Sequence, residues 1–209
     1  MAEDAWVDAV RDMLSHVAGE CPSEETGCRL AVAACEMGEY MVQKVELNQG
    51  LEGAAACEKG CSLCCHAQVP ISQPEAELLE AWIAENLTTA VREDILTRIS
   101  GNMELTHGCS LEERVSVWDQ TPCVFLHESV CRVYPARPLV CRAWHSIDRG
   151  QCQAAFDARD SDADIDNTPY RNYVLGVVRD ELLRLRPWPQ GDAVPLPEAM
   201  TLCFRKNHL

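Results

Sequence analysis

Cys57-Glu-Lys-Gly-Cys61-Ser-Leu-Cys64-Cys65 places four thiols within nine residues. Packing of an apolar core does not require cysteine at this density. A local turn is enough to bring thiols so close in sequence to one metal ion, and Gly60 permits a tight bend between two of them. A second group of four lies much later in the chain: Cys123, Cys131, Cys141 and Cys152. We therefore predict that these eight cysteines are candidate metal ligands, which could form two four-cysteine sites or one site with fewer ligands and some spare thiols.

The cysteine content also bears on the cellular compartment. The N-terminus is acidic and lacks the basic start and apolar stretch of a signal peptide, and no run approaches the ~18 apolar residues of a membrane span. We therefore expect a cytoplasmic protein, in which thiols stay reduced unless they bind metal. A chain of 209 residues with 47% hydrophobic content can bury a core without disulfides. The 13 cysteines are accordingly interpreted as ligands and core residues.

The charge balance indicates which partners to expect. The chain has 18 basic and 33 acidic residues, which gives a net charge of −15. Nucleic acids and anionic membranes bind to basic surfaces, so we expect neither as a partner. A metal ion is the expected partner, and the sequence identifies no protein partner.

The hydrophobic periodicity predicts a mainly α fold. Apolar residues three or four apart indicate six helices. They cover residues 3–18, 22–50, a segment opened by the capping box Ser72–Glu75, a segment ending at Gly101, a short segment capped by Ser110, and residues 168–187. Short β-prone runs around a polar turn predict a β-hairpin near residues 123–134. The prolines after Pro187 predict an extended tail on the surface.

We expect a single domain over residues 1–209. Its central part would be an irregular cysteine cluster at 57–152 that is held together by bound metal. Helical extensions would flank it at 1–50 and 168–209. Pro138 is expected to begin a short helix, which would place Cys141 near an N-terminus that stabilises a thiolate. The acidic loop Asp160–Asp164 begins like a calcium loop but lacks its glycine and its closing glutamate, so we interpret it as solvated.

Three stretches together resemble a known family. They are Cys57-x3-Cys61-x2-Cys64-Cys65, then Pro122-Cys-Val-Phe-Leu126, then Cys131-Arg-Val-Tyr-Pro-Ala-Arg137-Pro138-Leu-Val-Cys141-Arg142. This combination is similar to the YkgJ-type cysteine-cluster family of zinc- or iron-chelating domains. The resemblance covers residues 57–152 and implies that the eight cysteines are the ligands. A distant branch resembles flagellin lysine methylases, which are associated with an iron–sulfur cluster.

Thiolates select zinc, copper(I) or iron–sulfur clusters, and we favour iron, as an iron–sulfur centre, over zinc. A closed centre would indicate a metal-holding protein. An open position would indicate a redox or methyl-transfer enzyme, for which no catalytic residue is assigned. The spacing Cys57-x3-Cys61-x2-Cys64 also resembles radical S-adenosylmethionine enzymes, but the chain lacks their alternation of strands and helices.

Basic residues near the cysteines are candidates for contact with the metal centre. Arg137 and Arg142 could offset the negative charge of clustered thiolates, or pair with ordinary carboxylates. His66 and His145 could act as ligands or remain beside them. Arg92 and Arg98, on a predicted helix far in sequence from the cysteines, are expected to have no such role.

The adjacent cysteines Cys64 and Cys65 are expected to serve different metals. Neighbouring side chains diverge by about 100° on a helix and point oppositely on a strand. We therefore predict that Cys65 joins thiols from residues 123–152, in a second site or on the far side of a polynuclear centre. A buried, unligated Cys65 is the alternative.

The cysteines outside the two groups are expected to differ from these ligands. Cys28 and Cys35 share a helix face and are expected to pack in the core. The remaining cysteines, Cys21, Cys109 and Cys203, are assigned no role.

Overall fold

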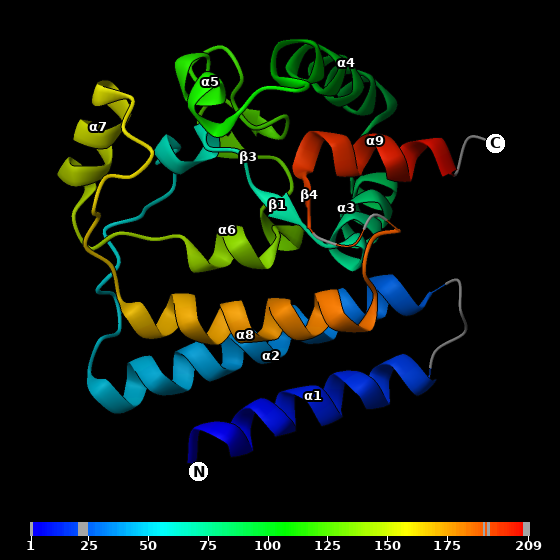
Figure 1. The fold of residues 1–209 in the computed structure, drawn as a ribbon, viewed down its shortest axis with the longest axis vertical. Coiled ribbons are helices and arrows are strands. Elements are labelled where there is room, and N and C mark those ends of the chain that lie inside the picture. The colour runs from blue at the N-terminus through cyan, green and yellow to red at the C-terminus, as the bar shows by residue number, and fades with distance from the viewer. Residues whose placement is uncertain (1, 21–24, 190, 192, 207–209) are drawn as a thin grey trace.

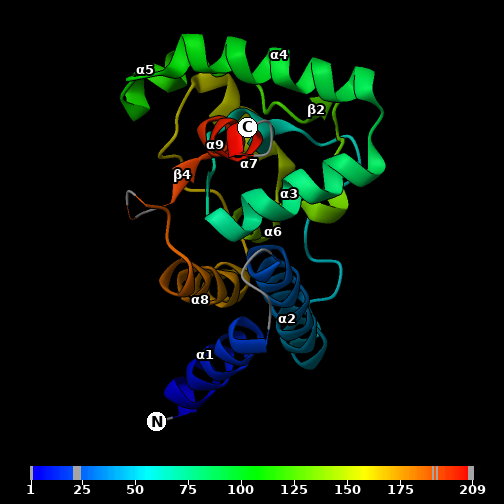
Figure 2. The ribbon, with the colours of Figure 1, turned by 90° about the vertical axis from the view of Figure 1, so that its right-hand side faces the viewer.

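The computed structural model describes residues 2–20, 25–189, 191 and 193–206. It is mainly helical, as the sequence predicts. Figures 1 and 2 show the helices in stacked layers, with α1 at one end, α2 and α8 above it, and α4 and α5 at the opposite end. Two hydrophobic cores lie in this stack.

The α1–α2–α8 core lies between three of the predicted helices. These are α1 (Ala2–Glu20), α2 (Thr26–Gln49) and α8 (Pro169–Leu185). Gly50 ends α2 in the left-handed conformation at φ 64°, which glycine adopts without a Cβ clash. Pro22, where the second helix was expected to begin, lies outside the described residues. The core itself is built from Val10, Leu14, Leu30, Ala34, Val42, Val174, Leu175, Val178 and Leu182.

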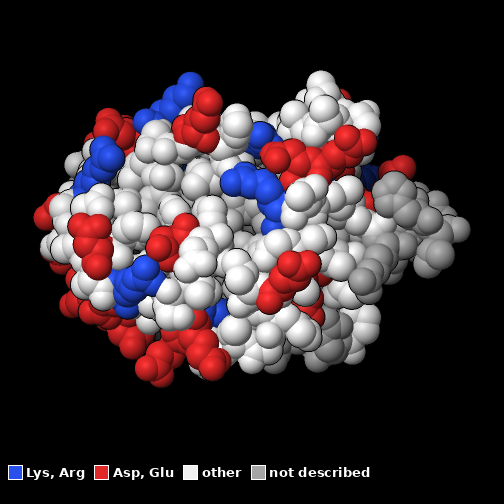
Figure 3. All heavy atoms as spheres, turned by 90° about the horizontal axis from the view of Figure 1, so that it is seen from above, with Lys and Arg blue, Asp and Glu red and all other residues white. Residues whose placement is uncertain are grey.

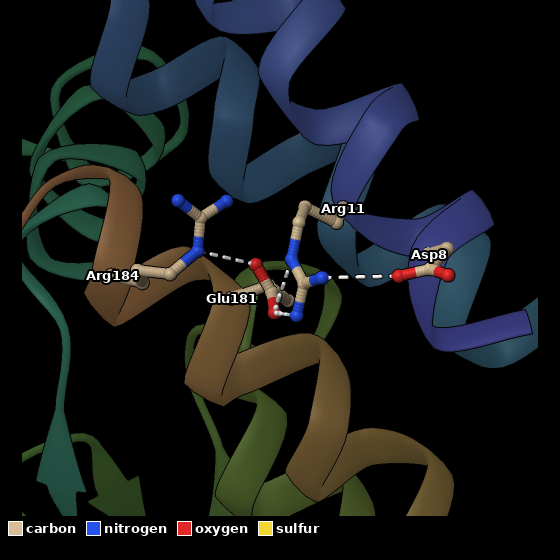
Figure 4. A network of polar contacts seen from close by, with 4 residues as sticks. All are labelled: Asp8, Arg11, Glu181 and Arg184. Carbon is tan, nitrogen blue, oxygen red and sulfur yellow. Dashed lines mark hydrogen bonds and ion pairs between the residues drawn. The ribbon is translucent and has the colours of Figure 1, made fainter. Parts of the chain in front are cut away.

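A polar network fastens α1 to α8 beside this core (Figure 4). Glu181 is only 7% exposed and accepts hydrogen bonds from Arg11 on α1 at 2.9 Å and from Arg184 at 2.6 Å. Burial alone would raise the pKa of Glu181, but the hydrogen bonds and charges of the two arginines outweigh it and lower the pKa below its ordinary value. The carboxylate therefore stays ionised in the fold.

The α3–α4–α9 core lies on the other side of α2. It is covered by α3 (Gln73–Asn86), α4 (Thr89–Thr106) and α9 (Leu196–Lys206), and the short α5 (Leu111–Ser116) follows α4. Ser72 and Ser110 cap α3 and α5 with complete capping boxes, as predicted for Ser72 and expected for Ser110. The main residues of this core are Ile71, Leu79, Ile83, Ile95, Ile99, Val124, Phe125, Ala199 and Met200.

Two antiparallel strand pairs are present in the described residues. The predicted hairpin forms, but only between β2 (Leu126–His127) and β3 (Val130–Cys131). Its turn residues Glu128 and Ser129 both have positive φ, which matches a tight hairpin turn. The second pair joins β1 (Pro70–Ile71) to β4 (Val194–Pro195) and was not predicted.

Two predictions were wrong, one about the end of a helix and one about the C-terminal tail. Helix α4 does not end at Gly101 but continues to Thr106, which is buried and donates a hydrogen bond from its hydroxyl to the Asn102 carbonyl at 2.8 Å. The tail beyond Pro187 is not extended on the surface. It pairs through β4 and then forms α9, whose Ala199 and Met200 are fully buried.

The short α6 (Leu139–Ala143) joins the two cores. Leu139 packs into the α1–α2–α8 core, whereas its neighbour Val140 packs into the α3–α4–α9 core. The helix is positioned by Glu75 of α3, whose Oε1 accepts a hydrogen bond from the Leu139 amide at 2.7 Å. The other oxygen of Glu75 accepts from the amide and hydroxyl of Ser72, each at 2.7 Å. Glu75 is 2% exposed, so a buried carboxylate holds the first residue of α6.

The end of the molecule that carries α4 and α5 is seen from above in Figure 3. Acidic and basic side chains alternate there with uncharged surface, and the described residues form no continuous basic area on this face. Across the described ranges, no helix is both long and apolar enough to cross a membrane.

Candidate metal centre

The first cysteine group lies on an irregular segment that ends in a single 3-10 turn. Residues 51–62 contain no helix or strand, and the turn η1 covers Leu63–His66. Gly60 has φ 95° between Cys57 and Cys61, which confirms the predicted tight bend. The segment is tied to the region after α6, where the Ala56 amide donates to the Ser146 carbonyl at 2.7 Å.

The second cysteine group is brought to the first by the fold. The Cys123 amide donates to the Cys65 carbonyl at 2.7 Å, which directly joins two segments 58 residues apart in sequence. Cys131 lies in β3, Cys141 in α6 and Cys152 in α7 (Arg149–Ala158). Helix α7 packs against η1. The two groups therefore meet even though three helices separate them along the chain.

A pocket of about 590 Å³ opens beside the cysteines. Five thiol-bearing residues line it: Cys57, Cys61, Cys64, Cys123 and Cys152. Trp118 and Phe156 form part of its wall, with their rings stacked at 5.3 Å. Cys131 and Cys141 are not among the lining residues and instead pack against the α3–α4–α9 core. The pocket-facing set is therefore Cys57, Cys61, Cys64, Cys123 and Cys152, and the inward set is Cys131 and Cys141.

The thiols are close enough to influence one another electrostatically. Burial raises the pKa of Cys57, and the neighbouring thiols of Cys61, Cys64 and Cys152 raise it further, while a hydrogen bond with the Ser146 backbone opposes them. The pKa of Cys64 is raised first by a hydrogen bond with the Cys65 thiol and then by burial. The two thiols therefore influence each other, and their assignment to different metals stays a prediction.

Cys64 also influences Cys123 of the pocket-facing set and Cys131 of the inward set. Burial raises the pKa of Cys123 to about 12, and both Cys131 and Cys64 contribute to the increase. Burial also raises the pKa of Cys131, with Cys64 adding to it. Cys64 therefore influences thiols of both sets.

The predicted stabilisation of a Cys141 thiolate by the start of α6 is wrong. Burial raises the pKa of Cys141 well above its ordinary value, and the thiols of Cys123 and Cys64 raise it further. The helix has only five residues, and the carboxylate of Glu75 already accepts the amide of its first residue. The negative charge at this helix start is therefore that of Glu75.

The donor chemistry suits zinc or iron, because thiolates are the ligands that both metals accept. In the residues that the structure describes, no three Cys, His, Asp or Glu side chains are gathered closely enough to hold one ion. Metal binding would therefore require the thiols to lose their protons and to approach one another, so that binding and local folding are coupled.

The two candidate arginines lie in different surroundings. Arg137 lowers the pKa values of Cys64 and Cys131 by its charge, and its guanidinium lies over the Tyr134 ring at 4.1 Å. Both arginines pair with the carboxylate of Glu39, Arg137 at 3.9 Å, but the other side-chain donors of Arg142 reach the carbonyls of Arg137 and Pro135. Arg142 therefore holds the 135–137 loop in place.

A further arginine near the thiols was missed from the sequence. Arg98 donates to the Val124 and Leu126 carbonyls, and its charge lowers the pKa of Cys123. Arg98 is far from the candidate ligands in sequence but lies near Cys123, because α4 packs across the Cys123 segment; its expected lack of a role in metal retention stays a prediction. Arg92 instead donates to the Leu87 carbonyl at 2.9 Å, close to the end of α3.

The two candidate histidines also differ. His145 uses both ring nitrogens, since Nδ1 donates to the Ala143 carbonyl at 2.8 Å and Nε2 accepts from the Thr168 amide at 2.9 Å. It therefore has no lone pair left for a metal. His66 lines the pocket, and its Nδ1 lies 3.0 Å from the Trp118 carbonyl.

The cysteines outside the two groups lie apart from the pocket wall. Cys35 is 5% exposed in the α1–α2–α8 core, and burial raises the pKa of its thiol to about 12. Cys203 is buried in the α3–α4–α9 core. The thiol of Cys109 donates to the Leu105 carbonyl at 3.4 Å. Cys28 is half-buried on α2, and Cys21 lies outside the described residues.

Comparison with known proteins agrees with this arrangement of thiols. The family model CxxCxxCC, described as "Putative zinc- or iron-chelating domain", matches residues 56–161, just over half of the 209-residue chain. The chain belongs to the CxxCxxCC family. The matched region contains all eight candidate ligands and supports metal binding, with zinc or iron as the metal. No curated protein and no solved structure matches the chain.

Proposed function

We propose that this CxxCxxCC protein holds iron, as an iron–sulfur centre, between the thiolates of residues 57–65 and those of residues 123–152. The observation that carries the proposal is the hydrogen bond from the Cys123 amide to the Cys65 carbonyl. It brings together two cysteine segments that local spacing alone would leave apart. Thiols from both segments then influence one another electrostatically.

The number of thiols around Cys64 favours a polynuclear centre. Cys64 interacts with Cys65 and contributes to the raised pKa values of four further thiols, those of Cys57, Cys123, Cys131 and Cys141. A single tetrahedral zinc ion takes only four ligands. A set larger than four suits a cluster, or more than one ion, better than one zinc.

The charge around the thiols supports the same proposal. A four-iron cluster with four thiolates carries a formal charge of about −2 when oxidised. Arg137 and Arg98 each lower the pKa of at least one cysteine of the group, so positive charge is already arranged for thiolates.

The pocket favours an open centre as a second candidate function. Five of the candidate ligands face a cavity of about 590 Å³, so a metal held by them would be reached by a small molecule. A redox or methyl-transfer enzyme requires such access, whereas a closed four-ligand site serves structure.

The proposal is tested by purifying the full chain anaerobically and measuring iron, zinc and acid-labile sulfide per chain. We expect a coloured protein that contains iron and sulfide and that becomes less compact when a strong chelator removes the metal. Cys131→Ser should lower the iron content, whereas Cys109→Ser, outside the cluster, should not. A colourless wild-type protein with stoichiometric zinc would refute the iron assignment.

A further inference from the structure

The pocket beside the cysteines has a wall that carries none of the candidate metal ligands. This wall is one face of α5 and of the turns that follow it, and the residues that line the pocket there are Arg114, Val115, Trp118 and Thr121. The Val117 and Thr121 amides donate to the carbonyls of Arg114 and Val117, both at 3.1 Å, so helical turns continue past the end of α5. Residues four apart on such turns share one side, which places Arg114 next to Trp118.

Two aromatic rings give the pocket a flat apolar surface. Trp118 stacks with Phe156 of α7 at a centroid distance of 5.3 Å and with an angle of 6° between the rings. Both residues line the pocket, and α5 and α7 lie at the same edge of the molecule, at the upper left of Figure 1. A cavity of about 590 Å³ with this lining has the size and the surface of a site for a small aromatic molecule.

Most polar side chains on the α4–α5 side of the pocket donate to the backbone. The hydroxyls of Thr106 and Thr121 each donate to the carbonyl four residues earlier, at 2.8 Å and 3.0 Å. The side-chain amide of Asn102 donates to the Pro122 carbonyl at 3.3 Å. These three side chains line the pocket, but their assigned donors are directed at the chain itself.

Arg114 is the exception. Its Nε donates to the Cys109 carbonyl at 3.0 Å. The other four N–H donors of the guanidinium have no assigned acceptor and no carboxylate partner among the residues that the structure describes. The carboxylate of Asp119 is instead paired with Arg159 at 3.1 Å. A half-buried guanidinium on the pocket wall therefore has donors left for an anionic ligand.

The acidic residues of the pocket are placed differently. Asp160 and Asp164 also line it, but both are exposed on the loop after α7, and Asp160 Oδ1 accepts the Asp162 amide at 3.0 Å. Exposed charges are screened by water and salt, whereas a half-buried charge is screened less. Arg114 therefore governs the recognition of a singly charged ligand, and the two aspartates disfavour ligands with several negative charges.

We propose that the pocket binds a small aromatic monocarboxylate, with its carboxylate on the terminal nitrogens of Arg114 and its ring along Trp118 and Phe156. The guanidinium presents paired donors in a planar fork, which matches the two oxygens of a carboxylate. The aromatic wall takes the body of the ligand. This inference goes beyond the proposed function, because neither Arg114 nor the two rings is a candidate metal ligand.

The test measures, by isothermal titration calorimetry, the binding of three probes that share one ring system to the full chain purified anaerobically. The probes are the anion 2-naphthoate, the neutral 2-naphthamide and the cation 2-naphthylmethylammonium, and metal content is determined on the same sample. We expect the wild type to bind 2-naphthoate at least about tenfold more tightly than 2-naphthamide, because a charged pair of hydrogen bonds replaces a neutral one. The cation should bind most weakly.

Arg114→Gln should abolish the preference for 2-naphthoate over 2-naphthamide, whereas Arg114→Lys, which keeps the charge without the fork, should retain part of it. Arg92→Gln is the matched control. Arg92 also donates from Nε to the carbonyl five residues earlier, at 2.9 Å, but it does not line the pocket, so its replacement should leave the preference unchanged.

Several results would overturn the inference. They are a wild type that does not bind 2-naphthoate, one that binds 2-naphthamide equally well or the cation more tightly, and a preference that persists in Arg114→Gln or is lost in Arg92→Gln. The metal measurement separates this inference from the proposed function. A chain without iron that keeps the preference would refute the iron proposal alone, and an iron-containing chain without the preference would refute this inference alone.

Discussion

The carboxylate of Glu75 offers the most quantitative test of how the fold positions the candidate ligands. It accepts three hydrogen bonds of 2.7 Å, from the Ser72 amide, the Ser72 hydroxyl and the Leu139 amide. Leu139 begins α6, which carries Cys141, so Glu75 connects α3 to the inward thiols. Glu75→Ala removes all three bonds and leaves two buried amides without a partner.

The cost can be estimated from these contacts. Each stranded buried amide costs about 1–3 kcal/mol, and loss of a helix cap costs about 1 kcal/mol. We therefore expect Glu75→Ala to lower the free energy of unfolding by about 4 kcal/mol, a large share of the 5–15 kcal/mol typical of a folded protein. With a urea slope of about 2 kcal/mol per M, the midpoint should fall by about 2 M.

The assay is urea unfolding of the reduced full chain, followed by far-ultraviolet circular dichroism, with Glu113→Ala as the matched control. Glu113 forms the same capping box with Ser110, with an equal amide-to-carboxylate distance of 2.7 Å, but it is solvent-exposed and holds no second helix. Its replacement should shift the midpoint far less. Equal shifts for the two variants would show that burial and the bond to Leu139 contribute nothing, which would refute the reasoning.

Three further outcomes are expected from other parts of the structure. Arg137→Met should reduce metal content per chain, because the cation near the thiolates is lost, whereas Arg179→Met on α8 should not; equal metal contents would exclude this role. Gly38→Ala should lower the urea midpoint, since its Cβ would lie 2.6 Å from a buried leucine side chain, whereas Gly176→Ala, with no atom within 4 Å, should leave the midpoint unchanged or raise it. Because the folded pKa of Glu181 is below its ordinary value of 4.5, its ionised form stabilises the fold above that pH. The stability difference between wild type and Glu181→Gln should therefore shrink as the pH falls below 4.5, and a difference that stays constant in acid would contradict this.

The helices could be predicted where burial repeats with the helical period. On α8, Val174, Val178 and Leu182 are buried at intervals of four residues, and the sequence shows this spacing directly. The last helix was missed because Pro195 and Pro197 were interpreted as breakers, although proline is tolerated in the first turn of a helix. The β1–β4 pair was missed because its strands lie far apart in sequence, without the connecting turn that indicated the β2–β3 hairpin.

The ligand chemistry could likewise be predicted from local sequence, but the grouping of the ligands could not. Spacing reports which thiols one turn of chain can present, and it correctly indicated the bend at Gly60. It carries no information on which side chains meet through tertiary packing. Cys64 and Cys141 influence each other across 77 residues because Glu75 holds α6 against α3 and because the Cys123 amide binds the Cys65 carbonyl. The surroundings of Arg137 and Arg142 have the same origin, since Glu39, which pairs with both arginines, lies about 100 residues earlier on α2. A cysteine cluster built from separate elements therefore depends on a few buried polar contacts that connect those elements, and these contacts are where variants should separate metal binding from folding.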